Sequence, residues 1–174
     1  MIWLIIVLIL CFVLSILILV YALSLIIGLI WAKGVPFVSL SKKQLRAIDK
    51  NIKLKPGDRV VDLGCGDARV LRMFEKQGVK DLTGYEINFW AYLSAKIKNK
   101  LLKSKSKVYF KNFKKADLSE YNVVFCYLLD YYLNSLKEKF DKELKPGTKI
   151  ISYGFPIKNW HKPEKIGRMF VYRI

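Results

Sequence analysis

The sequence predicts an α/β fold, in which a parallel sheet has helices on both faces and follows one transmembrane helix. Residues 1–32 contain no charged side chain, so the formal net charge of +17 belongs entirely to the rest of the chain. After residue 58, short apolar runs alternate with amphipathic helical runs, which is typical of parallel strands joined by crossover helices. A glycine turn at residues 64–66 follows the first of these strands.

The apolar run of residues 1–32 is long enough to cross a bilayer, which needs about 20 apolar residues. Trp3 and Trp31 are separated by 28 positions, or roughly 42 Å of helix at about 1.5 Å per residue. This is close to the full thickness of a bilayer, and indole rings favour its interfaces. A cleaved signal peptide fits poorly, because the run lacks a basic start and is too long.

Residues 33–57 are predicted to form a juxtamembrane linker and a short amphipathic helix. The linker begins with a break at 34–36, and Ser41 with Gln44 has the pattern of a capping box. Basic residues crowd this flank, at Lys33, Lys42, Lys43 and Arg46. The positive-inside rule therefore predicts a single-pass membrane protein whose C-terminal domain, residues 58–174, lies in the cytosol.

Strands and helices alternate through the third segment. Strands are predicted at 59–63, 82–86, 108–110, 123–128 and 148–155, with a last edge strand at 169–173. Helices are predicted from residue 70 to a stop at Gly78, over 88–102 and over 132–144. The pattern is that of a Rossmann-like sheet, which binds ligands at the carboxyl ends of its strands.

The strongest motif runs from Val60 to Arg69 and joins a strand to a helix through Asp62, Gly64 and Gly66. Glycines allow a tight turn and close approach of a ligand to the backbone. The free N–H groups of the following helix suit a carboxylate or a phosphate. An ordinary strand–turn–helix junction has the same pattern, so further signals are needed.

Two such signals follow the next strands. Glu86 ends the second strand, where a carboxylate can accept both hydroxyls of an adenosine ribose. Asn112 follows the third strand, where a polar side chain can meet an adenine edge. A nicotinamide fingerprint requires a third glycine at the position of Arg69, so S-adenosylmethionine is the favoured ligand. No Gly-Lys-Ser/Thr sequence follows, which excludes a Walker-type loop.

The chain resembles a single-span family of class I methyltransferases dependent on S-adenosylmethionine. This family includes mitochondrial protein-lysine methyltransferases of the ATP synthase c subunit and the adenine nucleotide translocase, and prokaryotic relatives. The resemblance rests on residues 62–69, 84–88, 121–125, 143–147 and 155–156 with Trp160, and on residues 35–38. Ala68 stands where a glycine is usual, which is acceptable if its φ is negative. Asn112 stands where the family tends to have Asp.

These patterns and the resemblance give a set of candidate site residues. The candidates for binding S-adenosylmethionine are Asp62, Gly64, Cys65, Gly66, Asp67, Glu86, Ile87, Asn112, Phe113 and Cys126. The catalytic candidates are Tyr127, at a strand end where it would lie beside the methyl group, and Asp130. Packing of the helix onto the sheet is the alternative role for each of the nearby tyrosines. No Asn/Asp-Pro-Pro-Tyr sequence is present, which argues against DNA-adenine methylation.

Composition narrows the remaining choices. Three separate cysteines and one histidine, His161, do not have the spacing of metal ligands or of a disulfide framework. A basic stretch contains Lys103, Lys105, Lys107, Lys111, Lys114 and Lys115. Beside a membrane span, we interpret it as attraction to anionic lipid rather than to nucleic acid.

The predicted function is methylation of a membrane acceptor, chiefly a lysine of a membrane protein. Two alternatives stay open: methylation of a lipid or quinone headgroup, and a membrane-anchored module that binds the cofactor without turnover.

Overall fold

The computed structural model describes residues 2–31 and 38–174, which form two compact units. The predicted break at 34–36 lies outside the described residues. The first unit is one helix, α1 (Ile2–Trp31), and its segment Ile2–Ile27 has a mean hydropathy of 3.4, enough by length and composition to cross a membrane. The hydroxyls of Ser15 and Ser24 donate to backbone carbonyls one turn earlier, at 2.7 Å, so these polar groups are satisfied within the helix.

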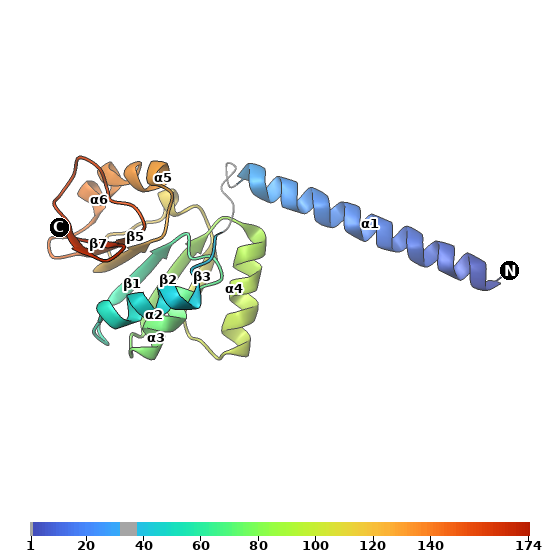
Figure 1. The fold of residues 1–174 in the computed structure, drawn as a ribbon, viewed down its shortest axis with the longest axis horizontal. Coiled ribbons are helices and arrows are strands. Elements are labelled where there is room, and N and C mark those ends of the chain that lie inside the picture. The colour runs from blue at the N-terminus through green and yellow to red at the C-terminus, as the bar shows by residue number, and fades with distance from the viewer. Residues whose placement is uncertain (1, 32–37) are drawn as a thin grey trace. The chain divides into compact units, whose positions relative to one another are not determined.

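The second unit is built on a sheet whose strand order, within residues 38–174, is β3-β2-β1-β4-β5-β7-β6 (Figure 1). The strands are β1 (Arg59–Leu63), β2 (Asp81–Glu86), β3 (Lys107–Phe110), β4 (Val123–Cys126), β5 (Lys149–Tyr153), β6 (Glu164–Ile166) and β7 (Met169–Arg173). Strands β1 to β5 are parallel, as predicted, whereas β7 is antiparallel to both β5 and β6.

Helices cover both faces of the sheet, as predicted (Figure 1). One face carries α2 (Lys42–Asn51), α3 (Arg69–Lys76) and α4 (Phe89–Leu101), and the other carries α5 (Asp130–Asn134) and α6 (Lys137–Glu143). Each face has its own apolar core. Ile48 and Phe74 belong to the first core, whereas Leu133, Phe140 and Tyr172 belong to the second. The cores fix the sheet and therefore the positions of its strand ends.

The capping box that begins α2 is confirmed. Gln44 N–H donates to Ser41 Oγ at 3.3 Å, and Ser41 N–H donates to Gln44 Oε1 at 2.7 Å. Ile48, at the centre of this helix, is fully buried in the first core. The amphipathic helix therefore packs as part of the second unit.

Three sequence predictions need correction. The strand at 169–173 is not the edge of the sheet, because β6 pairs outside it. The expected helix at 132–144 is two helices, since the chain makes a tighter turn at Leu136, whose N–H donates to Leu133 O at 3.1 Å. That turn keeps Leu133, Leu136 and Phe140 all buried. The fourth strand ends at Cys126, two residues before Leu128.

Candidate active site

A glycine loop connects β1 to α3 at the carboxyl edge of the parallel strands. The N–H groups of Gly64 and Cys65 both donate to Tyr85 O, at 2.9 and 3.1 Å, so the loop continues the pairing with β2. Gly64 has φ +79° and Gly66 φ +55°, values that side chains rarely adopt. A Cβ on Gly64 would lie 3.1 Å from the Leu128 side chain. Backbone geometry therefore requires both glycines, and the Leu128 side chain leaves little room for a Cβ on Gly64.

Ala68 completes the turn in a left-handed conformation, with φ 62° and ψ 23°. The condition under which alanine would be acceptable here, a negative φ, is not met. Ala68 N–H donates to Cys65 O at 2.9 Å, and the residue is fully buried, so the loop has to reverse direction within four residues. An alanine in this region costs roughly 1–2 kcal/mol, which explains why glycine is the easier residue here.

Glu86 connects the end of β2 to the glycine loop. Its side chain is 7% exposed. One carboxylate oxygen accepts from Gly66 N–H at 2.8 Å, and the other accepts from the N–H groups of Ile87 and Asn88 at 2.8 and 2.7 Å. Burial raises the pKa of Glu86, although these three hydrogen bonds oppose that rise. A carboxylate has about four acceptor positions, so a bound diol would use the remaining one and share another.

Asp62 lies at the end of β1 with only 2% of its surface exposed. Its carboxylate has no hydrogen bond to any residue within 2–31 or 38–174. Burial raises its pKa well above the usual value, and the nearby carboxylates of Glu86 and Asp67 raise it further. A buried carboxylate without a partner costs stability, and it attracts an amine or hydroxyl that can pair with it.

Asp67 is buried too, but its carboxylate is occupied. Arg69 Nε lies 2.7 Å from one of its oxygens, and Lys98 Nζ lies 2.6 Å from the other. Burial alone would raise its pKa, but hydrogen bonds from these two cations bring it well below the usual value. This cluster holds the glycine loop against α4. Asp67, a cofactor-binding candidate from the sequence, lines the small cavity beside this loop, and its carboxylate is paired with the two cations.

A small cavity opens beside the glycine loop. Its lining consists of Val38, Ser39, Leu40, Asp62, Gly64, Cys65, Gly66, Asp67, Arg69, Val70, Phe125 and Tyr127. The segment Val38–Leu40 was missed as part of the site. Leu40 is buried, and Arg69 Nη1 donates to its carbonyl at 2.6 Å. The signal in the sequence was an apolar residue before the Ser41 cap, the pattern of a hydrophobic staple.

The end of β4 brings the catalytic candidates to the same edge. Tyr127 lines the cavity, and its ring meets that of Tyr153 edge to face at 5.6 Å. The neighbouring Cys126 is fully buried in the second core, which raises the pKa of its thiol. Asp130 begins α5 outside the cavity lining, where its carboxylate pairs with Lys158 at 2.6 Å. Asp130 is therefore placed to hold the 155–158 segment.

The remaining candidates follow the ends of β2 and β3. Ile87 is half-buried beside Glu86, and Lys111 N–H donates to Glu86 O at 3.0 Å, which brings Asn112 close to the end of β2. Asn112 Oδ1 accepts from Lys114 N–H at 2.9 Å, and Phe113 is half-buried against the second core. These residues sit at the same edge as Asp62 but outside the cavity lining.

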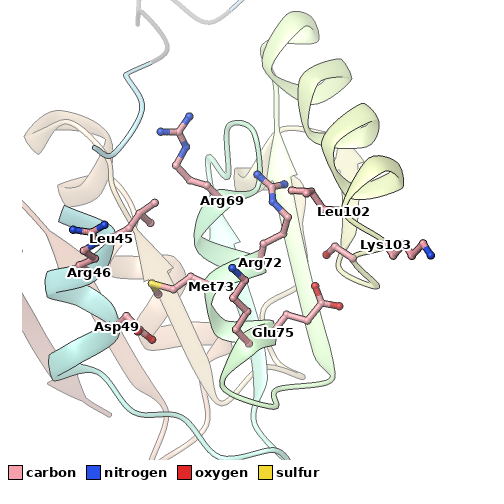
Figure 2. A pocket seen from close by; sticks show the side chains of 11 residues that line it. Leu45, Arg46, Asp49, Arg69, Arg72, Met73, Glu75, Leu102 and Lys103 are labelled. Carbon is pink, nitrogen blue, oxygen red and sulfur yellow. The ribbon is translucent and has the colours of Figure 1, made fainter. Parts of the chain in front are cut away.

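A larger cavity of about 560 Å³ lies between α2, α3 and the end of α4 (Figure 2). Charged side chains of both signs line it, including Arg46, Asp49, Arg72 and Glu75. It shares Arg69 with the small cavity, but none of the candidate site residues at the strand ends lines it. The chemistry predicted from the sequence therefore belongs to the smaller cavity.

Taken together, the strand ends offer a polar receptor for a cationic, adenosine-like molecule. Glu86 suits a vicinal diol, and Asp62 suits an amino group. The ring of Tyr127 presents an apolar wall that favours cations.

Comparison with known proteins agrees with this chemistry. Residues 62–165 match the family model described as the ANTKMT methyltransferase domain. A protein-lysine N-methyltransferase of Saccharolobus islandicus is 36% identical over 135 residues, which cover 76% of this chain and 84% of that protein. The adenine nucleotide translocase lysine N-methyltransferase of Mus musculus is 28% identical and matches 76% of this chain. The matched region spans 58% of the mouse protein's length.

Similar solved structures have the same fold. An RNA methyltransferase from Salinibacter ruber, in complex with S-adenosyl-L-homocysteine, has a TM-score of 0.68 and 26% identity. The match covers 78% of this chain and 92% of that one. A ribosomal protein L11 methylase from Lactobacillus delbrueckii has a TM-score of 0.59 at 18% identity, covering 75% of this chain and 78% of that one.

Proposed function

Because this chain belongs to the ANTKMT methyltransferase family and is similar to protein-lysine N-methyltransferases, we propose that it methylates a lysine of a protein at the membrane that holds α1. The domain is a class I methyltransferase, and its cofactor is S-adenosylmethionine. The acceptor, the anchor and the roles of single residues belong to the proposal.

The observation that carries the proposal is the buried, unpartnered carboxylate of Asp62 beside the Glu86 carboxylate. In the proposal, Glu86 binds the ribose hydroxyls, and Asp62 pairs with the amino group of the cofactor. When bound, the cofactor supplies an activated methyl group on a sulfonium. The residues of this chain bind and align it, since in-line displacement depends mainly on alignment.

The acceptor amine has to arrive without its proton, because only the neutral form is a nucleophile. An apolar entrance favours the neutral form of a lysine. Tyr127 and Tyr153, whose rings touch at 5.6 Å, form such a wall beside Asp62. We assign Tyr127 to the contact with the acceptor. Asp130, through its ion pair with Lys158, acts as a positioning residue.

The helix α1 gives the reason for a membrane acceptor. Confinement to a bilayer raises the effective concentration of any acceptor in the same bilayer and does nothing comparable for a soluble one. The basic residues Lys42, Lys43 and Arg46 follow this helix in the sequence, so the proposal places the catalytic unit in the cytosol. Two similar proteins are named for lysine methylation, one of the adenine nucleotide translocase and the other of the c subunit of ATP synthase.

The test uses the full chain, native membranes and cofactor with a tritiated methyl group. After the reaction, protein, lipid and RNA are separated, and labelled protein is hydrolysed to locate methyl-lysine. We expect the label in protein, on lysine, and much less of it with the isosteric variant Asp62→Asn at limiting cofactor. Label in lipid would replace the proposal by a headgroup methyltransferase, and label in RNA would replace it by an RNA enzyme. Cofactor binding without transfer to any fraction would indicate a binding module.

A further inference from the structure

The carboxyl edge of the sheet carries exposed apolar side chains at or after the ends of several strands. They range from 39% exposed at Phe155 to 76% at Tyr131. This set, which we call the rim patch, is Val38, Phe89, Phe110, Leu129, Tyr131 and Phe155. Val38 lines the cavity, and the others follow or end the strands β2, β3, β4 and β5. In the strand order, the rim patch therefore lies on both sides of β1, which ends at the glycine loop.

Two rings of the rim patch contact each other, and both side chains remain exposed. The rings of Phe89 and Phe110 meet edge to face at 6.0 Å, and Tyr92 packs against Phe110 at 5.5 Å. Large exposed apolar patches on soluble surfaces mark contacts with a protein or a membrane. The other exposed apolar side chains of this unit, Ile97, Leu101, Leu102 and Tyr109, lie along α4 and β3.

The charges beside the rim patch are positive. Lys111, Lys114 and Lys115 follow β3, and Arg168 approaches the end of β5, where Gly154 N–H donates to its carbonyl at 2.9 Å. The carboxylates at this edge are buried, as at Asp62, Asp67 and Glu86, or paired, as in the ion pair of Asp130 with Lys158. Aromatic rings interleaved with cations fit the interface of a bilayer that contains anionic lipid.

Chain connectivity limits how far this edge can lie from α1. Seven residue steps separate Trp31 from Val38, and a fully extended chain of that length spans at most about 25 Å. Val38 belongs to the entrance of the site. If α1 spans a membrane, as the proposed function holds, this length limits how far Val38 can lie from the end of the span.

We infer that the rim patch is a second membrane-binding surface, which inserts its rings into the interface of an anionic bilayer and turns the active-site entrance toward the headgroups. The inference rests on the proposed membrane anchor. It narrows the acceptor to lysines at the depth of the headgroups, because a lysine far above the bilayer would not reach an entrance that faces it.

The test places a fluorophore on each edge of the sheet in the full chain with Cys11→Ser, reconstituted in vesicles. One variant carries the label through Lys111→Cys, next to the rim patch, and the matched one through Lys145→Cys, whose side chain is 67% exposed and which pairs with Glu120 far from the entrance. The buried thiols of Cys65 and Cys126 label slowly, because burial raises their pKa. Brominated phosphatidylglycerol and phosphatidylcholine in the vesicles quench a fluorophore that touches the bilayer.

We expect quenching of the label at residue 111 and none at residue 145. The double variant Phe89→Ser/Tyr131→Ser should abolish the quenching, whereas the control Ile97→Ser/Leu101→Ser removes equally exposed apolar groups and should leave it intact. The inference would be overturned if neither label were quenched. It would also be overturned if only the control variant lost quenching.

The experiment separates this inference from the proposed function. Resistance of the protein to extraction by alkaline carbonate tests the anchor, and the methyl-transfer assay tests the acceptor. An anchored, active enzyme with an aqueous label at residue 111 would refute the second surface and leave the proposed function standing. Extraction by carbonate would refute the anchor first.

Discussion

The two edges of the sheet use acidic residues of the same types in opposite ways. At the amino edge, Arg59 pairs with Asp81 at 2.9 Å and with Glu120 at 2.6 Å, and all three side chains are exposed to water. At the carboxyl edge, Asp62 and Glu86 are buried, and burial raises the pKa of both. Exposed ion pairs change the free energy of unfolding very little. The carboxyl edge therefore gives up stability to keep charges ready for a ligand, which is how functional sites commonly differ from the rest of a fold.

The largest expected effect is at Asp62. The change Asp62→Asn removes a buried charge that lacks a partner, so it should raise the free energy of unfolding of the ligand-free protein by about 1 kcal/mol at pH 7. It should also weaken cofactor binding by about tenfold to a hundredfold, since it removes a charge-assisted hydrogen bond. Calorimetry measures the affinity, and chemical denaturation measures the stability.

The pH dependence of that stability gain follows from the sign of the shift. Because the pKa of Asp62 is raised on folding, the folded state keeps its proton to a higher pH than the unfolded state does. The cost of the buried charge therefore appears as pH rises. The advantage of Asp62→Asn should vanish near pH 4 and grow toward pH 7. A variant less stable than wild type at neutral pH would show that Asp62 has a structural partner.

A second effect is expected at Asp67, the buried carboxylate of the same edge that pairs with two cations. Asp67→Asn should lower the free energy of unfolding by about 2 kcal/mol, because Arg69 and Lys98 lose a charge-assisted partner. The pKa of Asp67 is lowered on folding, so its contribution is present at neutral pH and is lost as pH falls below 4. Urea titrations at pH 7 and pH 3 should show the difference shrinking. An equal loss at both values would contradict the assigned role.

A third effect concerns the backbone of the loop. Ala68→Gly should relieve the left-handed strain at φ 62° and raise the free energy of unfolding by up to about 1 kcal/mol, part of the gain being offset by the flexibility of glycine in the unfolded chain. Thermal unfolding measures this change. Lys103, with φ 53° in an exposed turn, offers a matched control through Lys103→Gly.

The smallest effect is expected at the amino edge. Arg59→Gln removes two exposed ion pairs, so thermal unfolding at physiological salt should change little and cofactor affinity should not change. A clear loss of affinity in this variant would end the contrast between the edges, because it would connect the amino edge to the site.

Sequence reasoning found the parts of the site that local patterns encode. The glycine turn after Leu63 and the carboxylate at the end of β2 follow from strand–turn–helix order, and parallel strands bring their carboxyl ends together. The partners of a side chain are set by packing between distant segments. The ion pair of Asp67 with Lys98 joins residues 31 positions apart, so spacing did not reveal that this carboxylate is occupied.

Backbone geometry and strand pairing were also beyond local patterns. Nothing in the residue type indicates that Ala68 adopts a positive φ, because the value is imposed by the loop between β1 and α3. The place of β7 between β5 and β6 depends on a return of the chain after Tyr153, which no periodicity encodes. The cover of the loop by Val38–Leu40 comes from a segment predicted to be a linker.

The buried thiol of Cys65 gives the enzyme a natural reporter of its own opening. Its sulfur lies within the cavity wall at 5% exposure, and its raised pKa keeps it protonated at neutral pH. A thiol in this state reacts with alkylating reagents only during brief excursions of the loop. The rate of alkylation therefore reports how often the loop opens, and a ligand that closes the loop would slow the alkylation. Mass spectrometry of the native chain can measure this alkylation rate without any engineered label.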